Sequence, residues 1–137
     1  MIRIFVPGQP VAKGRPRMTL RGGRPASFTP AKTVAYEGLV AHAGALVMAG
    51  ADLLEGPVRL RMVARFQLPK SASKARRALA EEGRDYHTGR PDLDNVLKAV
   101  ADGLNGVVWR DDAQVAETVV RKVYGETPGV EIEVTPL

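Results

Sequence analysis

Hydrophobic and polar residues alternate most clearly in residues 58–68, where every second position is apolar and three arginines lie between them. A period of two predicts a half-buried β-strand with a basic outer face. Residues 2–6 and 113–124 are β-prone, and residues 130–134 alternate with two glutamates. A turn at residues 127–129 separates the last two strands, which we expect to pair as a hairpin.

The clearest helical pattern lies in residues 91–105, where apolar positions recur at i, i+3, i+4, i+7 and i+11. This spacing places one apolar stripe along a helix. The stripe consists of Leu93, Val96, Leu97, Val100 and Leu104. A shorter helix is expected to begin after Ser71 or Ser73 and to extend to about residue 82, because serine is a favoured N-cap.

A further helix is predicted for residues 30–49, which are rich in alanine. Thr29 is the expected N-cap and Pro30 the first helical residue, since proline is tolerated there. Gly50 is the expected stop.

Residues 7–30 are rich in proline and glycine. A loop of this length within a compact domain is usually functional or mobile. The first 36 residues hold seven bases and no acid. We therefore expect a mobile basic loop at residues 7–30 of a single domain that spans residues 1–137, which is the usual size of one domain.

The charges are segregated along the chain. The formal net charge is +5, yet residues 91–137 contain nine acids and four bases. Basic blocks favour a polyanionic partner, which an acidic cluster repels unless a cation lies between them. The absence of cysteine excludes disulfides, thiolate metal sites and cysteine nucleophiles and fits a cytoplasmic protein. The longest uncharged stretch, residues 38–51, is too short to span a bilayer, and we expect no membrane partner.

Five aspartates fall within 21 residues: Asp92, Asp94, Asp102, Asp111 and Asp112. The start of the helix and the start of the next strand, joined by one loop, are able to bring Asp92, Asp94 and Asp112 together. Carboxylates without cysteine or histidine suit Mg²⁺, which also binds phosphate and activates water. Lys98 lies one helical turn after Asp94 and is suited to offset transition-state charge. The structural alternative is that these aspartates favour the helix N-terminus and a turn, with an ordinary i,i+4 ion pair.

Three stretches closely resemble the RusA family of Holliday junction resolvases: residues 90–99, 102–106 and 109–115. They combine a D-x-D-N-x-x-K helix with a D-D-x-Q-V strand start. His87-Thr88 and residues 13–17 are similar to the phage-type branch of this family. The resemblance implies a small α+β fold of two layers, with a mixed sheet packed against helices.

The resemblance also implies a homodimer that cuts four-way DNA junctions by paired nicks in recombination and repair. It implies dependence on Mg²⁺, for which Mn²⁺ is a candidate substitute, and no small-molecule substrate. Carried onto this chain, the family pattern makes Asp92, Asp94 and Asp112 the essential acids and Lys98 a functionally required lysine. Asp111 ranks second to Asp112 as a ligand, and Asp102 is expected to hold Lys98. Residues 83–90 lack the dense basic run of the chromosomal branch, so no cleavage sequence is inferred.

Several basic residues are candidates for phosphate contact. Three of them alternate along the Pro-rich loop and the others come from the second basic block: Lys13, Arg15, Arg17, Arg90 and Lys74. For Lys74 the alternative is a solvated surface helix. His87 is interpreted as a proton shuttle or, more commonly for a lone histidine, a structural brace. Trp109 is expected to pack beneath residues 106–110, with stacking on a base as the alternative.

Two other functions remain open at the level of sequence. One is a non-catalytic DNA-binding dimer, which needs the bases but not the acids. The other is a metal-dependent nuclease that acts on other branched DNA or on RNA. Sensitivity of cleavage to EDTA, together with a panel of DNA substrates, distinguishes these two functions from junction resolution.

Overall fold

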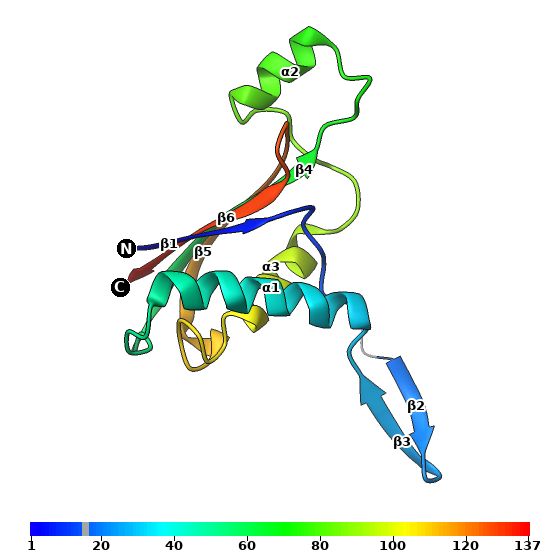
Figure 1. The fold of residues 1–137 in the computed structure, drawn as a ribbon, viewed down its shortest axis with the longest axis vertical. Helices are drawn as coiled ribbons and strands as arrows, with labels where there is room; N and C mark the ends of the chain where they lie inside the picture. Colours follow the sequence, from blue (N-terminus) through cyan, green and yellow to red (C-terminus); the bar gives the residue numbers. More distant parts are fainter. Residues whose placement is uncertain (15–16) are drawn as a thin grey trace.

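A four-stranded mixed sheet carries the fold in the computed structural model, which describes residues 1–14 and 17–137, Arg17 by its backbone alone (Figure 1). Its strand order is β1-β6-β4-β5. The strands are β1 (Ile2–Pro7), β4 (Val58–Gln67), β5 (Val115–Gly125) and β6 (Gly129–Pro136). β4 pairs in parallel with β5 and antiparallel with β6, which is antiparallel to β1. The predicted α+β fold with a mixed sheet packed on helices is confirmed.

The predicted hairpin of the last two strands is wrong, because β4 lies between β5 and β6. β4 has the longest apolar alternation in the chain, and its five inward residues are almost completely buried. A central strand pairs on both sides and leaves no open edge, so the most apolar strand takes that place. The short turn between β5 and β6 connects the two neighbours of β4 instead of pairing them.

Helices α1 (Ala31–Met48) and α3 (Leu93–Gly103) cover one face of the sheet (Figure 1). Two glycines set their close approach. A Cβ on Gly44 would lie 2.9 Å from Leu104, and one on Gly103 would lie 2.8 Å from Val40. The residues that lower helix propensity are therefore the ones that allow the two backbones to pack.

The helix boundaries differ slightly from those predicted. α1 begins at Ala31, so Pro30 rather than Thr29 is its N-cap, and it makes no side-chain cap bond. α3 is shorter than residues 91–105; within its stripe Val96, Val100 and Leu104 are fully buried while Leu93 is 38% exposed. The short helix α2 (Lys74–Glu81) is capped by Ser73, whose Oγ accepts a hydrogen bond from Arg76 N at 3.1 Å.

A β-hairpin at residues 17–28 replaces part of the loop predicted for residues 7–30. Strands β2 (Arg17–Arg21) and β3 (Arg24–Phe28) pair antiparallel. The two residues between them, Gly22 and Gly23, both have positive φ, as tight hairpin turns require. A Gly-Gly pair between two short strands is a hairpin signal that the abundance of proline obscured. The hairpin projects from the molecule at the end opposite α2 (Figure 1).

Within residues 1–14 and 17–137, no helix combines the length and the apolar character needed to cross a bilayer.

Candidate active site

Lys98 connects the helix motif to the strand motif. It lies on α3, and its Nζ donates to Asp112 Oδ2 at 3.0 Å and lies 2.9 Å from Asp102 Oδ1. Asp112 opens a 3₁₀ turn (Asp112–Gln114) that leads directly into β5. The expected contact between Asp102 and Lys98 is therefore present, and the two motif segments meet at this lysine.

The local structure of the D-D-x-Q sequence separates its two aspartates. Asp111 Oδ1 accepts from Ala113 N at 3.2 Å, while Gln114 Oε1 accepts from Asp111 N, which forms a capping box. Gln114 Nε2 also donates to the carbonyls of Leu54 and Gly56 at 2.9 and 3.0 Å. Asp111 is thus engaged in the turn, whereas the Asp112 carboxylate points to Lys98.

Asp92 and Asp94 stand at the start of α3. Asp92 is the N-cap but its side chain makes no capping bond, and Asp94 Oδ1 accepts from Asn95 N at 3.0 Å. Both are exposed. Asp94 precedes Lys98 by four residues and so lies on the same side of the helix. Nowhere in the described part of the chain do three or more Asp, Glu or His side chains form a cluster close enough to hold a metal. The structure thus joins Asp112 to Lys98 without assembling Asp92, Asp94 and Asp112 into one cluster.

The ion pair at Lys98 also fixes the protonation of its members. Hydrogen bonds with Asp102 and Asp112 raise the pKa of Lys98 above its ordinary value. The hydrogen bond from Lys98, followed by one with Asp111, lowers the pKa of Asp112. At neutral pH the site therefore holds the Lys98 ammonium next to an ionised Asp112 carboxylate. The ionised form of a carboxylate is the one that binds a cation.

Two residues that sequence reasoning missed support the site. Lys122 on β5 donates to the carbonyls of Gly89 and Pro91 at 2.8 and 2.7 Å, so it fastens the segment that precedes α3. Glu37 on α1 pairs with Lys13 at 2.5 Å. Glu37 carries a signal in retrospect, because it is the one acid of α1. Lys122 carries none, because it follows Arg121 on a strand of mixed polar and apolar residues.

Lys13 contacts two acids of the protein itself. Its Nζ pairs with Glu37 and lies 3.1 Å from Asp102 Oδ2, and its side chain is 22% exposed. The hydrogen bond to Glu37, followed by that to Asp102, raises the pKa of Lys13. Its charge is engaged within the protein, and contact of Lys13 with DNA phosphates stays a prediction.

The other predicted DNA-binding residues have different positions. Arg15 lies outside the described residues, and Arg17 begins β2. Arg90 and Asp92 line a groove of about 800 Å³ together with Lys32 on α1. Lys74 begins α2, at the far end of the molecule (Figure 1). Of the described candidates, Arg90 is the one that adjoins an acid of the predicted site.

His87 and Trp109 are packed residues. The His87 ring is largely buried and stacks on Phe66 with ring centroids 3.8 Å apart. Burial and the nearby Lys122 charge lower the pKa of His87. Trp109 is fully buried and donates from Nε1 to Asn105 at 2.9 Å. These contacts favour the brace over the proton shuttle for His87, and packing over base stacking for Trp109.

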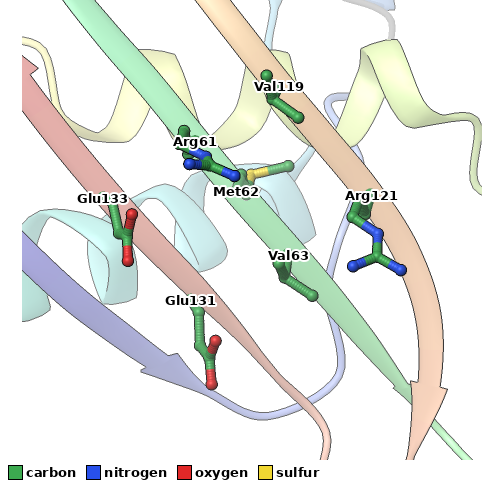
Figure 2. Close-up of a pocket in the computed structure, with 7 residues that line it drawn as sticks. All are labelled: Arg61, Met62, Val63, Val119, Arg121, Glu131 and Glu133. Atoms are coloured by element: carbon green, nitrogen blue, oxygen red, sulfur yellow. The ribbon is translucent and has the colours of Figure 1, made fainter. Parts of the chain in front are cut away.

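The outer face of the sheet has a separate, shallow hollow of about 210 Å³. Figure 2 shows its charged side chains in front of the strands, with the helices behind them. Two of its acids are paired with neighbouring arginines: Glu131 with Arg65 at 2.7 Å and Glu133 with Arg3 at 3.6 Å. This face is thus distinct from the one where Lys98 meets Asp112.

The mixed sheet and the acid–lysine site together define a small α+β protein whose D-x-D-N-x-x-K helix meets a D-D-x-Q-V strand start. Residues 7–135 match the family model of the endodeoxyribonuclease RusA, and the chain belongs to this family. Membership supports nuclease activity on branched DNA. The chain is also 38% identical over 133 residues to the uncharacterized protein YqaN of Bacillus subtilis (strain 168), an alignment that covers 96% of this chain and 93% of that protein.

Proposed function

We propose that this protein is a Mg²⁺-dependent endonuclease that resolves four-way DNA junctions by paired nicks. The observation that carries the proposal is the 3.0 Å contact between Lys98 and Asp112, which joins the two motif segments. Membership in an endodeoxyribonuclease family supports the chemistry. The basic residues of the chain support a nucleic acid as its substrate.

Asp92, Asp94 and Asp112 are the proposed metal ligands. Their donors are carboxylate oxygens, and Asp92 and Asp94 are exposed, which leaves room for the waters that Mg²⁺ retains. Asp111 is the weaker candidate because its carboxylate caps the 3₁₀ turn. When bound, the metal supplies a water of lowered pKa and neutralises phosphate charge.

Lys98 contributes a fixed positive charge to the proposed reaction. Its side chain is 52% exposed, which makes it accessible to a substrate phosphate. Its attraction to the phosphate grows as negative charge develops in the transition state. Asp102, one helical turn later on the same face, keeps it in place, and Asp112 shares it until DNA is bound.

The DNA surface that we propose surrounds the groove at Arg90, Lys32 and Asp92 and includes the arginines of the projecting hairpin. Neutralisation of several phosphates makes binding depend steeply on salt. Paired nicks in opposing strands need two active sites held at a fixed spacing. We therefore propose that the active form is a homodimer.

The test uses an end-labelled four-way junction beside duplex, flap and single-stranded DNA, each with Mg²⁺, Mn²⁺ or EDTA. We expect symmetric cuts in the junction with either metal and none with EDTA. Random nicking of plain duplex contradicts junction selectivity, and cleavage in EDTA contradicts metal dependence. Binding without any cleavage favours the non-catalytic dimer, and preferential cutting of flaps or of RNA favours the other nuclease.

A further inference from the structure

We propose that Lys13 is a positioning residue, which acts through Asp102 to set the place of Lys98 in the active site. This inference rests on the proposed function. It assigns to Lys13 a part in catalysis without contact with DNA. Glu37 on α1 is the anchor of the arrangement.

The geometry is a continuous chain of alternating charges. Glu37 pairs with Lys13, Lys13 with Asp102, Asp102 with Lys98, and Lys98 with Asp112, at 2.5, 3.1, 2.9 and 3.0 Å. Asp102 uses a different oxygen for each lysine, Oδ2 for Lys13 and Oδ1 for Lys98. The contact with Lys13 therefore fixes the rotation of the carboxylate that holds Lys98.

Exposure changes along this chain of charges. The side chains of Lys13, Glu37 and Asp102 are 22%, 23% and 17% exposed, whereas Lys98 is 52% exposed. Charges that are partly withdrawn from water are screened less by salt than exposed ones. Lys13, Glu37 and Asp102 therefore form the fixed part of the chain of charges, and Lys98 is the residue that contacts the substrate.

The backbone around Lys13 is held on two sides. Lys13 N donates to Asn95 O on α3 at 2.8 Å, and Gly14 N donates to Thr33 Oγ1 on α1 at 2.9 Å. A Cβ on Gly14 would lie 2.8 Å from the Pro30 ring, so the segment fits closely against the start of α1. This clamp separates Lys13 from an ordinary solvated loop lysine.

Removal of the Lys13 charge has a defined consequence. Glu37 and Asp102 would face each other without the cation between them, and like charges that share a site repel. Lys98 is the remaining cation in contact with Asp102 among the described residues. It would be drawn toward these two acids and away from Asp112, which misplaces the ammonium relative to the substrate phosphate.

The experiment compares Lys13→Met and Lys13→Arg with Lys70→Met, a control that removes the same charge from an exposed residue near α2. Single-turnover cleavage of the four-way junction is measured at saturating protein, with junction affinity measured separately in Ca²⁺. We expect Lys13→Met to lower the rate by about 10- to 100-fold, with an affinity change no larger than that of Lys70→Met. We expect Lys13→Arg to recover most of the rate. An unchanged rate, or a loss of affinity that accounts for the whole effect, overturns the proposal.

A second variant background separates positioning from direct contact. If Lys13 acts through Lys98, Lys13→Met causes no further loss of rate in a Lys98→Met protein, because coupled residues are not additive. If Lys13 contacts DNA independently, the two losses add, and the proposal is wrong.

A readout that needs no activity distinguishes failure of the inference from failure of the proposed function. The ammonium hydrogens of Lys98, held by two carboxylates, are expected to give a slowly exchanging signal in ¹⁵N-detected lysine spectra. Lys13→Met should weaken or shift this signal, while Lys70→Met leaves it unchanged. If wild-type protein cuts no branched DNA yet the signal responds, the function fails and the coupling stands. A signal indifferent to Lys13→Met overturns the coupling whatever the activity.

Discussion

The basic segment of residues 7–30 has two parts, one packed within the protein and one exposed. Lys13 is clamped between α1 and α3, and its charge is engaged by Glu37 and Asp102. The β2–β3 hairpin begins four residues later and projects from the molecule, with Arg21 and Arg24 exposed (Figure 1). Adjacent bases in one acid-free stretch therefore serve different purposes. One part stabilises the site from within, and the other is available to an external polyanion.

The difference arises from what surrounds each part. Lys13 faces two carboxylates brought in by helices distant in sequence, and both pairs are partly withdrawn from water. The hairpin instead exposes Met18 and Leu20 at 69% and 71% beside its arginines. A two-stranded ribbon of this kind has little stability alone, which is consistent with a role completed by a partner.

The largest expected effect is the loss of cleavage on substitution of Asp112, at the site that Lys13 supports. Asp112→Asn should lower junction cleavage on the order of 10³-fold, because it removes an ionised proposed ligand and the partner of Lys98. Binding to the junction should be retained or become tighter, since a negative charge is lost. Cleavage assays and gel-shift titrations measure both quantities. Cleavage at the wild-type level by Asp112→Asn would refute the proposed site.

A substitution at the α1–α3 contact tests how much close packing of these two helices, which hold Lys13 between them, contributes to stability. Gly103→Ala should destabilise the protein by about 1–3 kcal/mol, because its Cβ would lie 2.8 Å from Val40 and 3.1 Å from the Glu37 carbonyl. Gly38→Ala is the matched control, since nothing lies within 4 Å of the added Cβ. The control should be neutral or stabilising, and urea unfolding compares the two. Equal stability of both variants would contradict the packing argument.

The exposed part of the segment should show its effect in affinity. The double variant Arg21→Ala/Arg24→Ala should weaken junction binding by roughly tenfold and reduce the salt slope by about 2. Arg3→Ala/Arg59→Ala removes two charges from the outer sheet face, where both are paired with glutamates, and should have the smaller effect. Indistinguishable salt slopes for the two variants would remove the hairpin from the DNA surface.

The smallest effect concerns the buried His87 and acts through pH. Burial lowers its pKa, so the folded state takes up the proton less readily than the unfolded state. Its contribution to stability is therefore present above the unfolded pKa of about 6.5 and is lost as the pH falls below that value. Unfolding of His87→Gln should depend less on pH between 7.5 and 5.5 than that of wild type. His42→Gln, on the exposed side of α1, should retain the wild-type dependence.

Local sequence patterns predicted most elements correctly. The alternation of β4 and the stripe of α3 succeeded because each reports burial by periodicity. The order of the strands could not be predicted from local patterns, because the turn between β5 and β6 also suits a hairpin. Instead, each of these two strands pairs with β4. The hairpin of residues 17–28 was missed because its Gly-Gly turn is surrounded by prolines.

The sequence by itself determined the family motif, the charge segregation and the placement of Lys98 between Asp94 and Asp102 on one helix face, because helical spacing is a local property. Only the tertiary structure decided which carboxylate of the Asp111–Asp112 pair points to Lys98, and that Lys13 faces inward. Both depend on distant partners: Gln114 anchored on residues 54 and 56, and Glu37 approaching α3 where Gly103 permits it. The sequence determines which residues are charged, whereas tertiary packing determines which partner each charged residue contacts.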